Sequence, residues 1–271
     1  MTERIADASP RFKARTKRQE DNMSTGLRYC FLLAIAVCLH LAQPLMAQKG
    51  IKGNLVTFNW LEKNLKNADV VIIDASPSQI YTAKHIPGAI SYDIFTYGAQ
   101  EMPVAEIEKR YQSWGISSGK KIVMYDQGGS MMATRLFFSL DYYGFPTKDL
   151  FILDGGLSKW QEAGLPVTNE PTPAPKKGSF TIKELNEDAR VDLPEFLNAS
   201  GDQLNNVLVD ALDPNWHFGG VNIFGRPGHI PNAIMIPTTD FYNPDKTFKS
   251  AEEIKKILTY FGIKPEQQVY S

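Results

Sequence analysis

The chain contains two copies of one sequence pattern, and this repeat constrains the fold more than any other feature. Val70–Asp74 reads VVIID, and Val207–Asp210 reads VLVD. The string HIPGAI begins at His85, eleven residues after the first aspartate, and HIPNAI begins at His229, nineteen residues after the second. Landmarks that recur in one order indicate a single structural unit that is used twice.

A third landmark follows in the same order. Trp114-Gly-Ile precedes the apolar run Lys121–Tyr125, and Phe261-Gly-Ile precedes Val269–Ser271. When the two Gly-Ile pairs are aligned, Ser271 corresponds to Met124. The second copy is therefore expected to end inside a central strand, as in a chain truncated at its C-terminus.

The length of 271 residues suits two domains of ordinary size. We predict that the first unit spans residues 53–168 and the second spans residues 180–271. Between them, residues 169–179 begin NEPTPAPKK, a proline-rich stretch without hydrophobic periodicity that indicates a linker.

Each unit is predicted to have an α/β fold, a parallel sheet with helices on both faces. Short apolar runs bounded by Asp, Gly or Pro have the length of buried parallel strands: Val70–Ile73, Ile122–Tyr125, Leu150–Leu153 and Val207–Val209. Longer stretches between them have helical spacing: Val104–Trp114, Met131–Tyr143, Leu157–Ala163 and Ala251–Tyr260. Strands that alternate with helices predict a parallel sheet.

Composition excludes several classes of function. The formal net charge is −1, so no global charge attracts nucleic acid. The two cysteines, Cys30 and Cys38, lie in one apolar stretch, which excludes a disulfide scaffold and a CxxC zinc site. His85, His217 and His229 are scattered along the chain without ligand spacing, so we expect no metal site.

Residues 1–47 have the layout of a secretory signal peptide. Basic residues precede the apolar run Tyr29–Ala42, and small and polar residues follow it. Fourteen residues rise about 21 Å as a helix, which is short of the roughly 30 Å hydrocarbon core. We therefore predict an exported protein, periplasmic or extracellular. The alternative is a membrane anchor formed by residues 29–47.

The loop that follows the strand at 122–125 has the features of an anion cradle. Asp126, Gln127, Gly128, Gly129 and Ser130 lie between a predicted strand and a predicted helix. Successive backbone N–H groups at such a place can hold a thiolate, with its pKa lowered. Here the first position is an aspartate, which cannot accept sulfane sulfur, so we expect Asp126 to cap the helix and order the loop.

These features together resemble the rhodanese superfamily, and specifically its tandem-domain sulfurtransferases. The matching strings are HIPGA at His85, YDQGG at Tyr125, LDGGLSKW at Leu153 and GHIP at Gly228. The resemblance covers nearly all of residues 53–271. It implies two rhodanese folds, no cofactor, and as partners a small sulfur donor and a thiol acceptor, with no nucleic acid and with membrane contact only through the N-terminal segment.

The resemblance also implies that the first domain is catalytically silent, with Asp126 at the start of its loop. The active cysteine of the family begins the equivalent loop of the second domain and carries sulfur as a persulfide. In the repeat alignment this position falls two residues after Ser271. The 271-residue chain is therefore expected to lack its nucleophile and to be inactive, whereas the full-length protein is expected to be a thiosulfate or 3-mercaptopyruvate sulfurtransferase.

Other family positions match only in part. The resemblance implies a proton relay through Asp74 and His85, for which the alternative is that Asp74 ends a strand and His85 orders a turn. The second domain of the family carries two arginines, and this chain has Leu212 and Trp216 in their places. Arg226 is the nearest candidate to bind the substrate's negative group, since a guanidinium suits an anion.

Two readings of function remain open. The first is the exported sulfurtransferase, whose nucleophile is a cysteine beyond Ser271. The second is a binding module, a degenerate rhodanese pair without turnover, which Asp126, Leu212 and Trp216 favour. Phosphatase chemistry on a related loop would also need that cysteine.

Overall fold

The computed structural model describes residues 51–97, 102–222 and 225–271. By its internal contacts the chain separates into Met1–Lys49 and Gly50–Ser271, and every described residue belongs to the second unit. The predicted leader, residues 1–47, lies outside the described residues. None of the described helices is both long enough and apolar enough to cross a bilayer.

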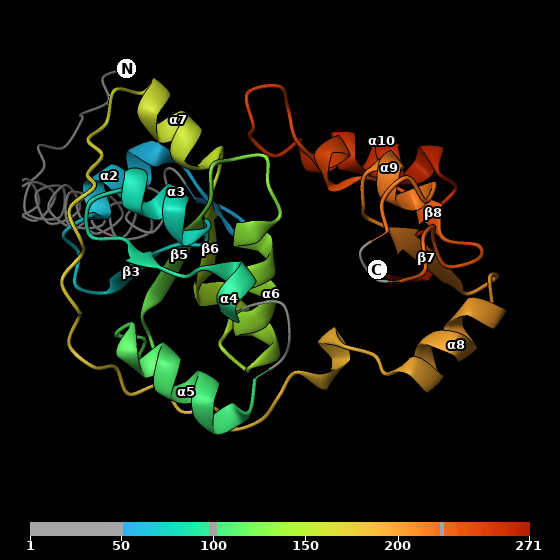
Figure 1. Ribbon diagram of the computed structural model, residues 1–271, viewed down its shortest axis with the longest axis horizontal. Coiled ribbons are helices and arrows are strands. Elements are labelled where there is room, and N and C mark those ends of the chain that lie inside the picture. The colour runs from blue at the N-terminus through green and yellow to red at the C-terminus, as the bar shows by residue number, and fades with distance from the viewer. Residues whose placement is uncertain (1–50, 98–101, 223–224) are drawn as a thin grey trace, which may run out of the picture. The chain divides into compact units, whose positions relative to one another are not determined.

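A six-stranded sheet organises the first half of the described chain (Figure 1). Its strands, in the order in which they lie, are β1 Ile51–Lys52, β2 Leu55–Val56, β6 Leu150–Leu153, β5 Lys121–Tyr125, β3 Val70–Asp74 and β4 Ile90–Ser91. β1 is antiparallel to β2, and all other neighbouring pairs are parallel. The predicted strands at 70–73, 122–125 and 150–153 are thus confirmed.

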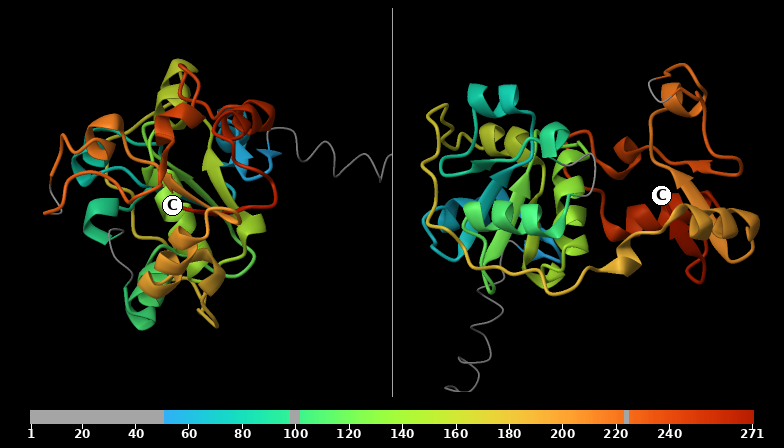
Figure 2. Two further views of the ribbon diagram at one scale, coloured as in Figure 1. Left: turned by 90° about the vertical axis from the view of Figure 1, so that its right-hand side faces the viewer. Right: turned by 60° about the horizontal axis from the view of Figure 1, so that its bottom comes forward.

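Helices cover both faces of this sheet (Figures 1 and 2). They are α2 Phe58–Asn64, α3 Ser78–Ala83, α4 Ile94–Tyr97, α5 Val104–Ser113, α6 Met132–Tyr142 and α7 Gly156–Glu162, with the 3₁₀ turn η1 Thr147–Asp149. Because side chains alternate along a strand, Ile73 packs in the core formed with α5 and α6, and Ile72 packs in the core formed with α2 and α7. The predicted parallel sheet with two helical layers is confirmed.

The segment 169–179 contains no helix or strand, as its proline content predicts. Its end is fixed to the first sheet's layers, because Gly178 N–H donates to Gln112 O at 2.7 Å and Phe180 N–H donates to Ile116 O at 3.1 Å. The Phe180 side chain is buried in the core with α5 and α6. The first residues after the linker therefore contribute to the stability of the first sheet.

A second parallel sheet lies in the second half of the chain. Its strands lie in the order β8 Ile234–Met235, β7 Asn206–Asp210 and β9 Gln268–Tyr270. This order repeats the order β4-β3-β5 of the first sheet. The register repeats as well: Asp74 pairs with Ser91 across β3 and β4, and Asp210 pairs with Met235 across β7 and β8. The two aspartates thus end equivalent central strands.

The helices of the second half are short and are positioned by local sequence. They are α8 Leu193–Gly201, α9 Pro214–His217 and α10 Ala251–Tyr260, with the 3₁₀ turns η2 Glu187–Ala189 and η3 Thr238–Phe241. α10 starts with a capping box, in which Ser250 Oγ accepts the Glu253 N–H and the Glu253 carboxylate accepts the Ser250 N–H. Val207, Ile236 and Ile263 form the buried centre between this sheet and its helices.

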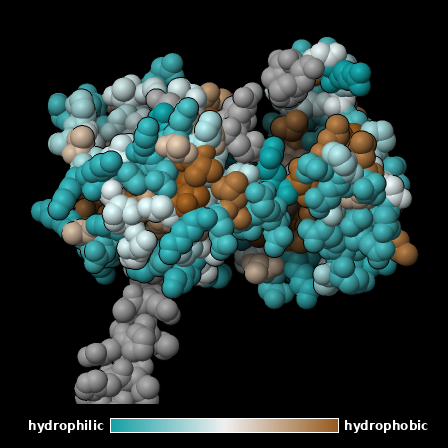
Figure 3. Space-filling view, turned by 90° about the horizontal axis from the view of Figure 1, so that it is seen from below, coloured by the Kyte–Doolittle hydropathy of each residue, from teal (hydrophilic) through white to brown (hydrophobic). Residues whose placement is uncertain are grey.

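One face of the molecule has the mixed polar and apolar character of an ordinary globular protein (Figure 3). Figure 3 shows one face, on which hydrophilic side chains predominate and hydrophobic ones form separate patches. Isolated apolar groups on a surface are common and indicate no site by themselves.

Replacing Trp160 by alanine should lower the free energy of unfolding by about 3–5 kcal/mol, because it leaves a cavity and an unpaired carbonyl. The Trp160 ring is fully buried, and its Nε1–H donates to Pro166 O at 2.8 Å. Chemical denaturation measures the change. The matched control is Tyr260→Ala, whose side chain is 85% exposed and should cost about 0.5 kcal/mol or less. Equal losses in the two variants would contradict this account of the core.

Candidate functional site

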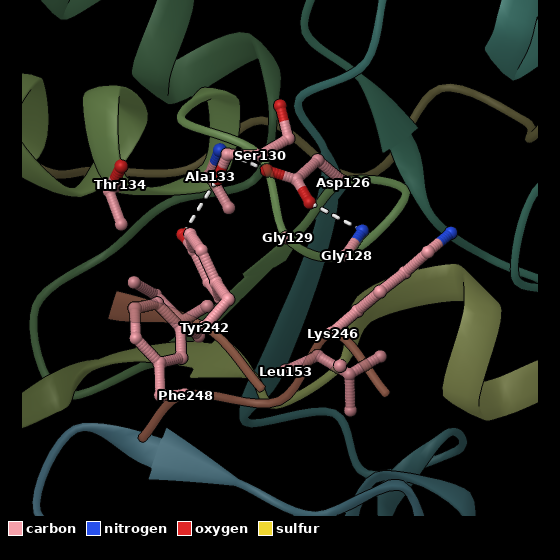
Figure 4. Close-up of a pocket in the computed structure, with 12 residues that line it drawn as sticks. Asp126, Gly128, Gly129, Ser130, Ala133, Thr134, Leu153, Tyr242, Lys246 and Phe248 are labelled. Atoms are coloured by element: carbon pink, nitrogen blue, oxygen red, sulfur yellow. Dashed lines mark hydrogen bonds between the residues drawn. The ribbon is translucent and has the colours of Figure 1, made fainter. Parts of the chain in front are cut away.

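The loop between β5 and α6 gathers backbone amides around the carboxylate of Asp126 (Figure 4). Asp126 Oδ1 accepts the Gly128 N–H at 2.7 Å, and Oδ2 accepts the Ala133 N–H at 3.0 Å. Gly128 and Gly129 have φ angles of 88° and 68°, a conformation that glycine adopts without strain. The cradle predicted at this loop is present, and the chain's own carboxylate fills it.

The electrostatics of the cradle are those of a buried acid. Burial raises the pKa of the Asp126 carboxyl, the amides of Ala133 and Gly128 lower it, and the charge of Asp74 raises it. Such a carboxylate satisfies the first amides of α6, which otherwise would have no partner. The residue therefore acts as a cap that orders the loop.

A hairpin from the second half of the chain, residues 242–248, covers this loop. We call it the covering hairpin; it is closed by a bridge between Tyr242 and Phe248. The Tyr242 hydroxyl points toward the loop in Figure 4 and donates to Ser130 O at 2.8 Å. The Phe248 N–H donates to Asp154 Oδ1 at 2.8 Å. Lys159 also pairs with Asp245 at 2.9 Å.

The space that remains between the loop and the covering hairpin is about 10 Å³, enough for about one water molecule. It is lined by Asp126, Gly128, Gly129, Ser130, Ala133, Thr134, Ile152, Leu153, Gly155, Tyr242, Lys246 and Phe248. A sulfur donor is much larger than this space. The first loop is thus closed both by its own carboxylate and by the hairpin.

Asp74 and His85 are both fully buried in the first half of the chain. Asp74 Oδ1 accepts the Ser76 N–H at 2.9 Å, and His85 Nδ1 lies 2.9 Å from Tyr81 O. Asp74 Oδ2 and His85 Nε2 are buried and have no hydrogen-bond partner in the described part of the chain. Burial raises the pKa of the Asp74 carboxyl. Each of these hydrogen bonds joins a side chain to a nearby residue of its own segment, and among the described residues no hydrogen bond joins Asp74 to His85.

The equivalent place in the second half holds a different set of side chains. Asp210 Oδ1 accepts the Leu212 N–H at 3.1 Å, as Asp74 accepts from Ser76. Asp210 Oδ2 lies 2.8 Å from Nδ1 of His217, which is on α9. The His217 ring stacks on that of His229, with centroids 3.6 Å apart and planes 8° apart. Two histidines that look scattered in the sequence are therefore in contact.

The remaining predicted positions lie near this stack in the sequence. Leu212 is exposed and Trp216 is half-buried. Because neither side chain is basic, neither supplies a positive charge. The Arg226 side chain is exposed and bonds to no described residue. Within the described residues, no group of three or more His, Cys, Asp or Glu could hold a metal ion.

Sequence reasoning missed His217 and the covering hairpin. A signal for His217 exists: it follows Asp210 by seven residues, as Tyr81 follows Asp74. The hairpin residues Tyr242 and Lys246 had no comparable signal, because their partners lie more than eighty residues away in the chain. Contacts of that kind depend on how the second half folds back on the first.

Comparison with known proteins identifies the fold and shows which proteins this chain is similar to. A model of the rhodanese-like domain matches residues 57–163. Two bacterial proteins share the name "Putative thiosulfate sulfurtransferase": the one from Saccharopolyspora erythraea is 30% identical over 225 residues, 77% of each chain, and the one from Mycolicibacterium smegmatis is 28% identical over 228 residues, 79% of this chain and 80% of its own. SseA from Escherichia coli, a 3-mercaptopyruvate sulfotransferase of known structure, superposes with a TM-score of 0.71 at 24% identity, over 80% of this chain and 87% of its own.

Asp126→Ala should lower the free energy of unfolding by about 1–3 kcal/mol, because two buried amides lose their acceptor. Asp126→Asn retains one acceptor oxygen and should cost less. Thermal and chemical denaturation measure both. Any catalytic activity should stay within a few-fold for both variants; a loss of several orders of magnitude in a folded variant would show that Asp126 is catalytic.

The buried Asp74 carboxyl should make stability depend on pH in a defined direction. Because its pKa is raised in the folded state, the folded protein binds the proton more tightly than the unfolded chain, so ionisation of Asp74 opposes folding above that pKa. Asp74→Asn should therefore be at least as stable as the wild type at pH 7, and its advantage should shrink as the pH falls toward 4. Melting temperatures across this range measure the difference.

The control for that series is Asp202→Asn. Hydrogen bonds from Asn205 lower the pKa of the exposed Asp202 carboxyl, so its ionised form favours folding. The wild type should therefore be the more stable protein at neutral pH, and its advantage should fade as the pH falls. If both variants showed the same trend, the raised pKa of Asp74 would be wrong.

Proposed function

Because the chain belongs to the rhodanese family of sulfurtransferases, we propose that the complete protein moves sulfane sulfur from a small donor, such as thiosulfate or 3-mercaptopyruvate, to a thiol or to cyanide. Two bacterial relatives that are 28–30% identical carry thiosulfate sulfurtransferase names, and the SseA structure carries a 3-mercaptopyruvate name. Transfer would pass through a cysteine persulfide.

The main support for this proposal is that the second sheet repeats the strand order and register of the first. β9 pairs with β7 as β5 pairs with β3, with Gln268 opposite Asn206 as Lys121 is opposite Val70. In this register the position equivalent to Asp126 is two residues after Ser271. The first loop shows that backbone amides converge on the residue at that position, and a thiolate there would be stabilised in the same way.

We propose that a thiolate at this position reacts in two steps, sulfur uptake from the donor and sulfur transfer to the acceptor. The thiolate attacks the outer sulfur of thiosulfate, the S–S bond breaks, and sulfite leaves with the electron pair. With 3-mercaptopyruvate the C–S bond breaks instead, and the carbon takes a proton to give pyruvate. Cyanide then attacks the outer persulfide sulfur, which releases thiocyanate and restores the thiolate.

We propose further that the protein is exported through the leader at residues 1–47. The support is the order of a basic, an apolar and a small-residue region in the sequence. Expression of the complete gene followed by N-terminal sequencing of the mature protein tests it. A mature protein that begins near Gln48 supports cleavage, and retention of Tyr29–Ala42 in the membrane fraction supports the anchor.

The test of activity uses the complete reading frame. We expect a cysteine as the second residue after Ser271, and thiocyanate release in the presence of cyanide from at least one of the two donors. Replacement of that cysteine by serine should abolish release, because serine forms no persulfide. Asp126→Asn serves as the matched control, since it changes the equivalent position of the closed loop.

Two outcomes would contradict the proposal. One is an aspartate, serine or glycine as the second residue after Ser271, which would favour the binding module. The other is a complete protein with an intact thiol that forms no product from either donor.

A further inference from the structure

The segment that leaves the first sheet is held to the first half of the chain over several residues. The Ile182 N–H donates to a carboxylate oxygen of Glu108 at 2.8 Å. The Asn186 N–H donates to Tyr142 O at 2.8 Å, and its side-chain amide donates to a carboxylate oxygen of Asp141 at 3.0 Å. The chain is therefore fixed to α5 and α6 as far as Asn186.

Residues 187–192 connect this anchor to α8. The backbone N–H groups of Ala189 and Arg190 donate to the carbonyl oxygens of Asn186 and Glu187, so both bonds are local. Movements between domains are absorbed by a few loop or element-terminal residues of this kind. Most side chains of the connection are exposed: Glu187, Asp188, Arg190 and Asp192.

The covering hairpin joins the two halves at a second place, and much of its contact is polar. In addition to the hydrogen bonds described above, Lys246 Nζ donates to Ser158 Oγ at 2.8 Å, and this bond is exposed. In the ion pair of Lys159 with Asp245, the two side chains are 23% and 49% exposed. Exposed contacts of this kind contribute little free energy, because water replaces them when they open.

A cleft of about 850 Å³ extends along α6 between the two connections. It starts at Thr134, which also lines the small space under the covering hairpin, and it reaches Asp192 at the end of the connecting segment. The halves are not packed against each other here, and domains without a large apolar interface are expected to move relative to one another. Side chains from both halves line the cleft, among them Met131, Phe138, Phe196, Ile230 and Val269.

We propose that residues 187–192 are a hinge and that the covering hairpin is a latch, so that the second half swings away from the first loop and closes on it again. In the closed form the hairpin covers the loop that begins at Asp126. In the open form this loop faces solvent and the cleft along α6 widens. The movement does not depend on sulfur transfer, so it would stand even if the proposed function failed.

Hydrogen exchange of single amides distinguishes opening of the latch from unfolding. The Phe248 N–H is bonded to Asp154 in the first half, whereas the Asn243 N–H is bonded to Thr247 O inside the hairpin. Opening therefore frees the first amide and leaves the second one bonded. The Ala75 N–H, which donates to Tyr125 O in the first sheet, reports unfolding of the first half. We expect Phe248 to exchange faster than Asn243 and Ala75, because local opening precedes global unfolding.

Two variants weaken the latch without changing its backbone. Tyr242→Phe removes the hydrogen bond to Ser130 and retains the ring that packs on Phe248, so the Phe248 amide should exchange about tenfold faster. Lys159→Met removes the pair with Asp245 and should speed the same amide about threefold. Asn243 and Ala75 should be unchanged in both.

The matched control is Tyr260→Phe, which removes a hydroxyl from a side chain that is 85% exposed on α10. It should leave all three amides unchanged. Because Lys159 lies at the surface, its variant still tests the latch if Tyr242→Phe fails to fold.

The hinge is tested by the distance between the halves in the full chain. Spin labels are attached to cysteines that replace the exposed Lys109 on α5 and Lys256 on α10, and every native cysteine is replaced by serine. Pulsed electron paramagnetic resonance then measures the distribution of distances. We expect two distances, of which the longer gains population in Tyr242→Phe and in Lys159→Met and is unchanged in Tyr260→Phe.

Three results would overturn the inference. If Phe248 exchanges only as slowly as Ala75, the latch opens only when the protein unfolds. If Asn243 speeds up together with Phe248, the hairpin unfolds and does not swing as a body. If the labels give one and the same distance in the wild type and in both latch variants, residues 187–192 are not a hinge.

Discussion

The loop between β5 and α6 has backbone N–H groups that need a hydrogen-bond acceptor, and the rest of the site depends on how this need is met. In the first half of the chain the carboxylate of Asp126 meets this requirement with two hydrogen bonds. In the same loop Gly128 lies so close to the backbone of Gly155 that a Cβ atom would clash with Gly155 O. The same compact loop provides the surface on which the covering hairpin lies. One carboxylate therefore orders the loop, starts α6 and shapes a contact with the second half.

The two halves share a strand order and register, and they differ in the side chains around the aspartate that ends the central strand. Asp74 and Asp210 both end a central strand and both accept an amide two residues later. Around Asp74 the frame is closed, buried and lined by phenol rings. Around Asp210 the second carboxylate oxygen lies 2.8 Å from the ring of His217, which is also buried. The two halves therefore repeat a backbone arrangement and differ in the side chains that surround its aspartate.

Much of the fold was predictable because its strongest signals are local. Strands β3, β5 and β6 are apolar runs bounded by polar or turn-forming residues. Helix α10 has the bounds that its helical pattern predicts, and Ser250 caps its start. The cradle and its capping aspartate also followed from a strand, two glycines and a helix in succession. The His217–His229 contact was not predicted, because an eight-residue insert, Phe218–Gly225, separates the two in the sequence and hides the equivalence with Tyr81 and His85. The covering hairpin was missed for a different reason, since hydrogen bonds such as Tyr242 to Ser130 depend on how distant segments meet.

The covering hairpin limits how the first loop could be turned into an active centre. Installing a cysteine in place of Asp126 would supply a nucleophile, and the amides would still point at it. Yet the Tyr242 hydroxyl and the Lys246 stem would continue to occupy the approach to that sulfur. Design of an active centre in this loop would therefore have to shorten or redirect residues 242–248 before a new nucleophile could react in the closed form.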